Sequence, residues 1–400
     1  MSTFKTLDDI TVSNKKILVR VDLNVPLKNG VVADSTRIEK VLPTITELSD
    51  KGAKVILLAH LGRPNGKDES LSLKPIADSI QKILADKRVT FAADCIGETA
   101  QHAVDALQQG DILLLENVRF YPQEEKNDPA FTAQLAALGD IYVNDAFSAA
   151  HRAHSSTEGL AKVLPCAAGR LMQAELEALE HALTTPERPV MAIVGGAKIS
   201  TKLDLLHNLV SKVDILAIGG GMANTFLYAQ GVNVGKSLCE KDAAETARAI
   251  LQEAAAQNCT ILLPTDVVAA DGFAANSPSE VYDLQSVPEG RMILDMGDAS
   301  IAAWCNALET AKTVVWNGPV GAFELEPFDK GTLALAAKIV ALTKAGKILS
   351  VAGGGDTIAA LVKAQSLDKL SYVSTAGGAF LEWLEGKKLA GVAALMGDRG

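Results

Sequence analysis

The chain has 400 residues, a mass of 42.0 kDa and a formal net charge of −10 at neutral pH. Because this length exceeds the size at which one hydrophobic core keeps growing, two domains are expected. The acidic balance argues against a general nucleic-acid binder, and no apolar run approaches the roughly 18 residues that a membrane span needs. The five cysteines are scattered and lack CxxC spacing, and the N-terminus lacks a secretory signal pattern, so the sequence predicts a cytoplasmic protein.

The first half of the chain alternates apolar runs, which predict buried strands, with segments of helical periodicity. Strands are expected at residues 17–25, 54–60, 89–93, 111–117 and 141–147. Between the first two, apolar residues recur at spacings of three and four from Ile38 to Leu48, which predicts a helix over residues 37–49. Continuous apolar strands joined by helices are typical of a parallel sheet that is covered on both faces.

An amphipathic segment with Met172, Leu176, Leu179 and Leu183 follows and ends before Pro186, so residues 172–188 are the expected linker helix and hinge. The second half repeats the alternation, with strands expected near residues 190–195, 215–219, 260–264, 292–295, 313–316, 348–352 and 372–374. The sequence therefore predicts an α/β protein with two Rossmann-like lobes, each a parallel sheet covered by helices on both faces, separated by a cleft. Residues 1–171 are the first expected domain and residues 189–388 the second, while residues 389–400 are expected to pack back on the first.

Basic residues are more frequent in the first half, where 20 basic residues face 22 acidic ones in residues 1–172. Seven of the eleven arginines lie there, and four of them follow expected strand ends or begin a helix: Arg37, Arg63, Arg119 and Arg152. Ligands of parallel sheets gather at the carboxyl ends of the strands, and a guanidinium group matches carboxylate or phosphate. One such arginine is usually a surface charge, but four at separate strand ends predict an anion site. His60, His151 and His154 are a weaker candidate for a metal site, because no helical HxxxH pair supports them.

In the second half, residues 347–357 read KILSVAGGGDT, which predicts a strand, a tight turn and the start of a helix. The glycines let the backbone approach an anion, and the unpaired N–H groups of a helix N-terminus favour phosphate. Asp356 cannot bind phosphate itself and is better placed to hold a divalent cation that does. A glycine-rich turn that binds nothing is the alternative for this segment taken alone.

Residues 194–203, VGGAKISTKL, place Lys198 and Lys202 four residues apart after a glycine pair. On a helix this spacing would put both ammonium groups on one face, where both could reach one polyphosphate; an ordinary solvated face is the alternative. Further glycine-rich strand ends occur at residues 219–222 and 317–321. Neither a GxxxxGK[ST] P-loop nor a GxGxxG fingerprint is present, so neither common nucleotide motif applies.

Nine blocks of the sequence resemble the phosphoglycerate kinase family, in order and along the whole chain. They are RVDLNVP, HLGRP, ENVRF, NDAFSAAHRAHSS, VGGAKISTKL, GGGMANTF, WNGPVGAFE, VAGGGDT and STAGGAFLEWLEGK. The resemblance implies reversible transfer of the γ-phosphoryl group of ATP, with Mg²⁺, to the carboxylate of 3-phosphoglycerate, which gives 1,3-bisphosphoglycerate and ADP. It also implies a hinge-bending monomer that binds one substrate in each lobe.

The resemblance assigns roles to individual residues. The glycerate substrate would be held by Asp22, Leu23, Asn24, Arg37, His60, Leu61, Gly62, Arg63, Arg119 and Arg152. The nucleotide would be held by Lys198, Lys202, Gly220, Gly297, Asn317, Glu324, Gly354, Gly355, Asp356 and Thr357, with magnesium on Asp356. The residues implied to act on the transferred group are Arg37, Lys198, Gly354 and Gly377. Ala376 stands where the family usually has glycine and Asp298 where it commonly has proline, but neither change removes a charged catalytic group.

Two other functions stay open from the sequence. A two-lobed nucleotide-linked dehydrogenase is weakened by the missing dinucleotide fingerprint, and a non-catalytic phosphate-binding protein on the same fold is disfavoured by the intact Arg37, Lys198 and Asp356. The chemistry of a carboxylate kinase agrees with the residues present. A carboxylate is already ionised at pH 7 and needs no general base, so catalysis depends on cations that bring two anionic substrates together.

Overall fold

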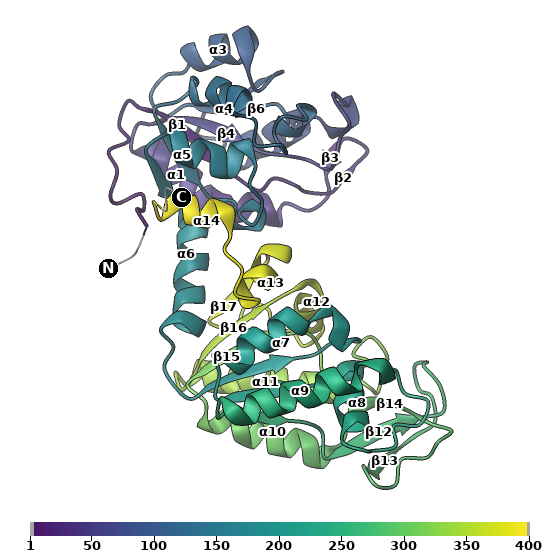
Figure 1. Ribbon diagram of the computed structural model, residues 1–400. Helices are drawn as coiled ribbons and strands as arrows, with labels where there is room; N and C mark the ends of the chain where they lie inside the picture. Colours follow the sequence, from purple (N-terminus) through teal and green to yellow (C-terminus); the bar gives the residue numbers. More distant parts are fainter. Residues whose placement is uncertain (1–3, 398–400) are drawn as a thin grey trace. The chain divides into compact units, whose positions relative to one another are not determined.

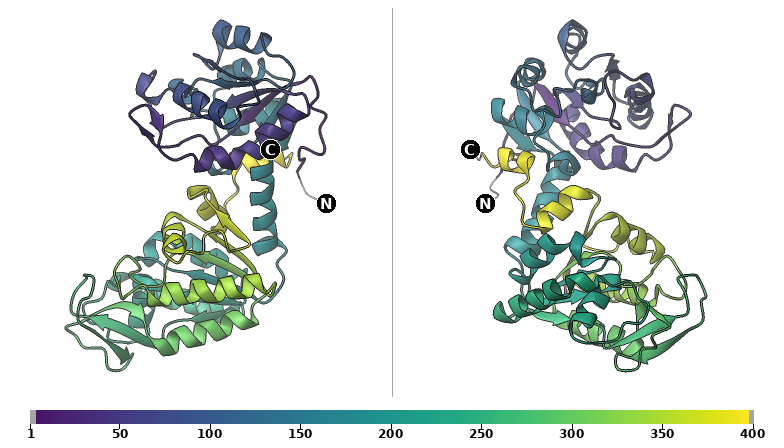
Figure 2. Two further views of the ribbon diagram at one scale, coloured as in Figure 1. Left: turned by 180° about the vertical axis from the view of Figure 1, so that it is seen from behind. Right: turned by 45° about the vertical axis from the view of Figure 1, so that its right-hand side comes forward.

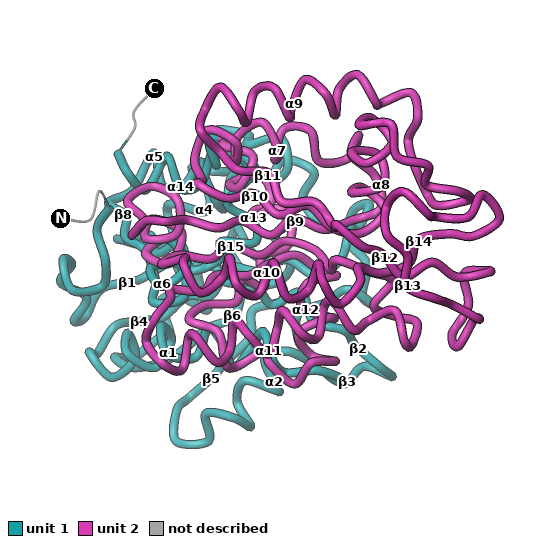
Figure 3. Tube along the Cα trace, turned by 90° about the horizontal axis from the view of Figure 1, so that it is seen from below, with its two compact units in different colours: residues 1–176, 388–400 teal, residues 177–387 magenta. Residues whose placement is uncertain are grey.

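The computed structural model describes residues 4–397, and the chain divides into two compact units. Unit 1 comprises residues 1–176 and 388–400, and unit 2 comprises residues 177–387 (Figure 3). Each unit contains one six-stranded parallel sheet flanked by helices, so the predicted fold class is confirmed. The outermost parts of the expected first domain and C-terminal segment, residues 1–3 and 398–400, lie outside the described residues.

The sheet of unit 1 has the strand order β5-β6-β4-β1-β7-β8. Its strands are β1 (Lys16–Arg20), β4 (Lys54–Leu58), β5 (Val89–Ala92), β6 (Ile112–Leu115), β7 (Ile141–Asn144) and β8 (Cys166–Ala168). Its helices are α1 (Thr36–Asp50), α2 (Lys74–Ile83), α3 (Gly97–Asp105), α4 (Pro129–Ala136) and α5 (Leu160–Val163). A hairpin of β2 (Leu27–Lys28) and β3 (Val31–Val32) and four short helical turns, Glu69–Leu71, Val118–Phe120, Phe147–Ala149 and Ser155–Gly159, complete it.

Both faces of this sheet are covered because successive side chains of a strand point to opposite sides. In β1, Ile17 and Val19 pack with α1 and α2, whereas Leu18 packs with α3, α4 and α5 (Figure 1). The strands are therefore mostly apolar, and many of the polar residues lie where the strands begin or end.

Two segments at the unit boundary pack on unit 1. The helix α6 (Arg170–Leu179) continues into a π-helical turn, Glu180–Thr184, and its Met172 N–H donates to Asp145 Oδ1 at 3.0 Å. The helix α14 (Ala390–Leu395), near the end of the chain, packs on α5 and β8, and Gly391 N–H donates to the Ala150 carbonyl at 2.7 Å. Segments from both ends of the chain thus contribute to one unit.

The parallel sheet of unit 2 has the order β11-β10-β9-β15-β16-β17. Its strands are β9 (Val190–Val194), β10 (Ile215–Ile218), β11 (Thr260–Leu262), β15 (Thr313–Asn317), β16 (Leu349–Gly353) and β17 (Tyr372–Ser374). The helices α7 (Leu203–Val210), α8 (Gly220–Ala229) and α9 (Ala244–Ala256) lie together on one face, and α10 (Asp298–Thr310), α11 (Lys330–Lys344) and α12 (Gly355–Lys363) on the other (Figure 2). Short turns at Ile199–Thr201 and Lys241–Ala243 and the helix α13 (Gly378–Leu384), which contacts α7, complete the unit.

One expected strand belongs to a different sheet. The run near residues 292–295 is β14 (Met292–Met296), which pairs antiparallel with β12 (Asp266–Ala270), and β12 in turn pairs with β13 (Ser279–Asp283). The prediction that this run continues the parallel alternation is therefore wrong, because periodicity detects a strand but not its partner. Most other strands end earlier than expected, since the residues after them leave the sheet to form loops at its carboxyl edge.

No helix among residues 4–397 is both long enough and apolar enough to cross a bilayer.

Candidate functional site

Most of the predicted anion-binding residues of unit 1 follow the carboxyl ends of its strands, and Arg37 is oriented by one of them, Asp22. It lies in the first turn of α1, where its Nη1 is 2.6 Å from Oδ2 of the buried Asp22. The same oxygen accepts from Ser148 Oγ at 2.5 Å, and Asp22 Oδ1 accepts from the Asn24 N–H at 3.0 Å. The Asp22 carboxylate, which has three partners, thus orients the guanidinium group of Arg37. The Arg37 side chain is still 40% exposed and so accessible to a ligand.

The loops after β1, β4 and β6 are joined at Gly62. Its N–H donates to Asn24 Oδ1 at 3.0 Å, and its carbonyl accepts from Arg119 Nη1 at 2.9 Å. Gly62 has a φ of +63°, a conformation that favours glycine, and a Cβ there would lie 3.0 Å from the Leu71 side chain, which would have to shift. Arg119 also forms an ion pair with Glu125 at 3.3 Å, and burial lowers the pKa of Arg119. Three loops are thereby held as one surface.

The other predicted residues of unit 1 differ in their exposure. Arg63 is exposed, and Arg152 is half-buried with its Nε 3.1 Å from His151 Nε2. Leu23 and Leu61 are buried apolar residues of the core, so their side chains support the loops instead of facing a ligand. Leu23 and Leu61 were predicted as substrate-binding positions without a stated side-chain role, and that stays a prediction.

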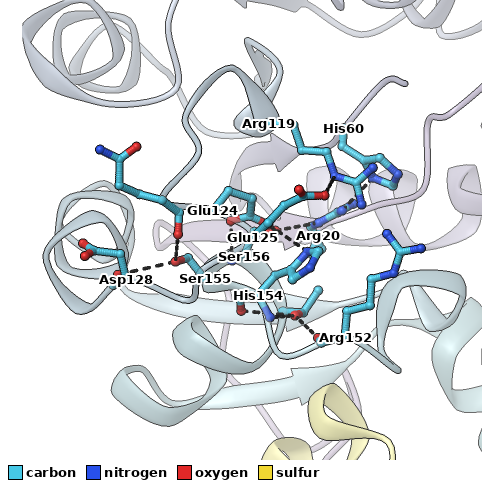
Figure 4. A network of polar contacts seen from close by, with 12 residues as sticks. Arg20, His60, Arg119, Glu124, Glu125, Asp128, Arg152, His154, Ser155 and Ser156 are labelled. Carbon is cyan, nitrogen blue, oxygen red and sulfur yellow. Dashed lines mark hydrogen bonds and ion pairs between the residues drawn. The ribbon is translucent and has the colours of Figure 1, made fainter. Parts of the chain in front are cut away.

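His60 lies among positive charges. The side chains of Arg119 and Arg152 extend towards it, and Arg20 contacts it directly (Figure 4). Burial, followed by the charges of Arg20, Arg119 and Arg152, lowers the pKa of His60, which is therefore neutral at physiological pH. The loops of unit 1 thus form a basic surface suited to an anionic ligand. Within residues 4–397 no group of three His, Cys, Asp or Glu side chains could hold a metal ion. The alternative of a metal site formed by His60, His151 and His154 therefore has no support.

In unit 2 the glycines that follow the strands allow the loops to pack closely against one another. A Cβ on Gly195, after β9, would lie 1.8 Å from the Pro319 carbonyl oxygen, and one on Gly220 would lie 2.7 Å from the Gly196 oxygen. A Cβ on Gly297, which precedes α10, would lie 2.2 Å from the Asp266 carboxylate. Gly195 and Gly220 allow two backbones to approach closely, and Gly297 makes room for a carboxylate, whatever ligand binds there.

Lys198 and Lys202 do not share a helix face, so that expectation is wrong. A short 3₁₀ turn, Ile199–Thr201, separates them; Lys198 is exposed, whereas Lys202 turns back to the strand ends. Its Nζ lies 2.7 Å from the Gly195 carbonyl oxygen and 2.6 Å from Asn317 Oδ1. These acceptors at the ends of β9 and β15 hold the ammonium group against the strand ends. Burial lowers the pKa of Lys202 to about 8, although the nearby Asp356 opposes this change.

Asn317 and Thr357 join the loops after β15 and β16. Asn317 Nδ2 donates to the Gly353 carbonyl at 2.8 Å, and Thr357 Oγ1 donates to the same oxygen at 2.8 Å. Thr357 Oγ1 also accepts from the Gly318 N–H at 2.7 Å. Both side chains are buried, so their role in this arrangement is to hold the glycine-rich turns in place.

The N-terminus of α12 is open. Gly354 precedes it with a φ of +101°, and Gly355 and Asp356 in its first turn are exposed. A Cβ on Gly355 would meet no atom within 4 Å, so the unpaired N–H groups of this turn are accessible to an anion. Gly377 likewise has a positive φ, +56°, before α13 with open space around it, whereas Ala376 is buried. Where the family usually has three glycines, the residue with the left-handed backbone conformation is thus Gly377, and this chain keeps that glycine.

A pocket of about 570 Å³ lies beside this helix, lined by residues of β14, the start of α8 and the loop after β15. Three of its lining residues were predicted nucleotide contacts, namely Gly220, Glu324 and Asp356. Two others, Leu238 and Phe273, are 52% and 65% exposed, which is unusual for large apolar side chains. The sequence gives no motif for them, because they come from loops far apart in the chain. The pocket suits a flat apolar group next to a charged one.

The loop that carries Glu324 is fastened to α12. Lys363, the last residue of that helix, places its Nζ 2.9 Å from the Phe323 carbonyl oxygen and 2.7 Å from Asp329 Oδ2. Helix α12 therefore has two roles. Its N-terminus is open to an anion, and its C-terminus holds one wall of the pocket. Sequence reasoning missed Lys363, since nothing local distinguishes it from a surface lysine.

Comparison with known proteins identifies the family. Residues 7–387 match the family model of phosphoglycerate kinase. Curated phosphoglycerate kinases of Bradyrhizobium diazoefficiens and Rhodopseudomonas palustris are each 63% identical to this chain, over 392 and 393 residues that cover 98% of both sequences. The solved structure of phosphoglycerate kinase from Coxiella burnetii matches with a TM-score of 0.93 and 41% identity, over 99% of this chain and 100% of that one. The dehydrogenase and the non-catalytic alternatives find no support here. The chain therefore belongs to the phosphoglycerate kinase family.

Proposed function

We propose that this chain transfers the γ-phosphoryl group of ATP reversibly to the carboxylate of 3-phosphoglycerate, giving 1,3-bisphosphoglycerate and ADP, as a step of glycolysis or gluconeogenesis. The main support is the identity of 63% to curated phosphoglycerate kinases over almost the whole chain. The charged residues that such a transfer needs, Arg37, Lys198 and Asp356, are all present. We also propose a cytoplasmic monomer; the five cysteines are free, as a reducing compartment requires.

Unit 1 is proposed to bind 3-phosphoglycerate, with residues 1–171 and 389–400 as its domain. The basic surface formed by Arg63, Arg119 and Arg152 supports this, since guanidinium groups bind phosphate and carboxylate through paired hydrogen bonds. Asp22 and Asn24 hold the loops, and the ring of His60 adds a neutral donor.

Unit 2 is proposed to bind the nucleotide, with residues 189–388 as its domain and 172–188 as hinge. The base would occupy the apolar part of the pocket, near Leu238 and Phe273, and Glu324 would accept hydrogen bonds from the ribose. The phosphates would then lie at the N-terminus of α12, within reach of Lys198, while Lys202 holds the strand ends together.

The residues present fit magnesium bound with the nucleotide. Asp356 is an exposed carboxylate at the open N-terminus of α12, and among residues 4–397 it belongs to no group of three or more His, Cys, Asp or Glu side chains that could hold a metal ion. Magnesium suits such a site, because it keeps several waters and usually takes one or two carboxylates together with substrate phosphates. When bound, it would neutralise charge on the phosphate oxygens.

The reaction itself needs positioning and charge neutralisation. A carboxylate oxygen of 3-phosphoglycerate attacks the γ-phosphorus in line, the bond to the bridging oxygen of ADP breaks, and ADP leaves as the anion. No proton is transferred, so no general base is required. Negative charge on the moving phosphoryl group would be stabilised by Arg37 from unit 1 and by Lys198 and the N–H groups before α12 and α13 from unit 2.

Because both units supply groups to one transfer, we expect them to approach each other when both substrates are bound. Small-angle scattering should show that 3-phosphoglycerate and MgATP together lower the radius of gyration more than either ligand alone. A radius that stays the same under all four ligand conditions would argue against closure.

Replacement of Lys363 by methionine should release the Glu324 loop from α12. We expect the KM for MgATP to rise about fivefold, the loss expected for one charged hydrogen bond on a partly exposed loop, while kcat and the KM for 3-phosphoglycerate stay within about twofold. Lys369→Met is the matched control, because the Lys369 side chain donates to the Gln365 carbonyl within its own segment and not to the Glu324 loop. Equal KM values for MgATP in the two variants would rule out a role for Lys363 in the pocket.

A further inference from the structure

Arg20 is a buried charged residue of unit 1. It ends β1, lies in register with Leu58 of β4 and Asn144 of β7, and is only 1% exposed. Burying a guanidinium group costs free energy unless its charge and donors are matched, so the partners of Arg20 indicate what it is for.

All three nitrogen atoms of the Arg20 guanidinium group have a partner. Nε donates to Ser156 Oγ at 2.9 Å, Nη1 donates to the Val21 carbonyl at 2.5 Å, and Nη2 lies 2.8 Å from Nδ1 of His60 (Figure 4). Three contacts in different directions fix the plane of the group, and with it the direction of the hydrogen bond to His60.

The charge of Arg20 is balanced by a buried carboxylate behind it. Glu124 is 0% exposed; its Oε1 accepts from Ser156 Oγ at 2.5 Å and its Oε2 accepts from the Ser156 N–H at 2.9 Å. Ser156 thus accepts from the arginine and donates to the glutamate, which is the direction expected when both groups are ionised. Burial raises the pKa of Glu124, and the charge of Arg20 opposes this.

The contact between Arg20 and His60 determines where the histidine carries its proton. A guanidinium group has five N–H donors and no acceptor, and it stays protonated in proteins. Nδ1 of His60 must therefore be the acceptor and carry no proton, so that the proton of the neutral ring lies on Nε2. We propose that Arg20, held by Ser156 and Glu124, is a positioning residue that fixes His60 in the Nε2–H tautomer and so presents a neutral donor to the anion site.

The groups that face His60 agree with this assignment. Arg20, Arg119 and Arg152 are positive, and His154, whose pKa is lowered to about 4, is neutral at physiological pH. Of the neighbouring carboxylates, Glu125 pairs with Arg119 and Glu124 lies behind Ser156. An imidazolium would place an N–H on Nδ1 against the N–H of Arg20, so protonation would break the contact. The hydrogen bond to Arg20 uses Nδ1 alone, so the Nε2–H does not take part in it and can donate to a ligand.

The consequence for substrate affinity rests on the proposed function, whereas the tautomer itself does not. A neutral N–H donor can bind an oxygen of 3-phosphoglycerate over the whole physiological pH range, because it does not depend on protonation. In the opposite tautomer Nε2 would present a lone pair to an anionic oxygen and repel it.

The tautomer can be tested by ¹⁵N NMR of the full chain with labelled histidine, with the His60 signals identified by their absence in His60→Gln. We expect Nε2 to be protonated and Nδ1 unprotonated at pH 7, with no titration down to pH 5. A protonated Nδ1, alone or in an imidazolium, would overturn the proposal. Because this measurement needs no turnover, its failure is separate from any failure of the proposed function, which the assay of the parent chain tests.

The role of Arg20 is tested by Arg20→Met. In a variant whose circular dichroism matches the parent, the His60 signals should show exchange between the two neutral tautomers, and the KM for 3-phosphoglycerate should rise about tenfold with the KM for MgATP unchanged. An unaltered Nε2–H tautomer in this variant would show that Arg20 does not set it.

If Arg20→Met does not fold, Ser156→Ala provides the test, because it removes only the Nε acceptor and the link to Glu124. Ser155→Ala is its control: Ser155 is equally buried, but its hydroxyl points to the carbonyls of Gln123 and Asp128. The tautomer mixture and the rise in KM should appear in Ser156→Ala and not in Ser155→Ala. The same behaviour in both variants would mean a general effect of altered packing and would refute the positioning role.

Discussion

Replacement of Arg37 by alanine is expected to lower kcat by about 10³-fold or more, which corresponds to roughly 4 kcal/mol of transition-state stabilisation. The KM values should change much less, because the guanidinium group acts mainly on charge that develops as the carboxylate oxygen and the phosphoryl group converge. Its contact with Asp22, itself held by Ser148 and Asn24, means that it is oriented before any ligand binds. Arg37→Lys should recover only part of the activity, because an ammonium keeps the charge but lacks the planar fork.

Steady-state kinetics on folded protein test this prediction. Arg88→Ala is the matched control in the same unit, since the Arg88 side chain is 60% exposed and pairs with Asp111 at the opposite edge of the sheet. Its loss should change neither kinetics nor stability by more than about 0.5 kcal/mol. If the activity of Arg37→Ala stays within a fewfold of the parent, Arg37 is a surface residue like Arg88 and has no catalytic role.

Replacement of Asp356 by alanine is expected to have the second largest effect. The kcat/KM for MgATP should fall at least about 100-fold, because the nucleotide would lose the carboxylate proposed to hold its magnesium ion, a contribution of several kcal/mol. Binding of 3-phosphoglycerate alone should stay nearly unchanged, since Asp356 belongs to unit 2.

Calorimetric titration with each ligand separately measures both expectations for Asp356→Ala. Glu245→Ala is a suitable control, because Glu245 is also an exposed acidic residue in the first turn of a unit 2 helix but does not line the pocket. Equal weakening of the two ligands by Asp356→Ala would contradict the assignment of one substrate to each unit.

The sequence predicted the two parallel sheets because their strands are buried on both faces and therefore read as continuous apolar runs. In β1 and β9 almost every residue is buried, and such runs have few other interpretations. The sheet of β12, β13 and β14 was not predicted. The strand β13 is largely exposed, so it lacks the apolar run that marks a buried strand, and the antiparallel pairing joins segments that periodicity cannot match.

The sequence could predict those residues of the candidate site that directly follow a strand or begin a helix. The positions of Arg37 and Asp356 at helix starts are visible in the sequence, and the structure places them there. The side chain of Lys202 was misplaced, because its acceptors, Gly195 and Asn317, come together only when β9 and β15 pair. Arg20 was missed although a signal existed, since an arginine inside the apolar run KILVRV is buried and needs partners.

The most direct test of the proposed function is an assay of the purified chain with ATP, magnesium and 3-phosphoglycerate, coupled to the reduction of 1,3-bisphosphoglycerate by a dehydrogenase that consumes NADH. We expect NADH to be consumed at a rate that requires both ATP and 3-phosphoglycerate, is abolished by chelation of magnesium and falls about 10³-fold in Arg37→Ala. The absence of turnover by folded protein, or ATP consumption that does not depend on 3-phosphoglycerate, would contradict the proposed function.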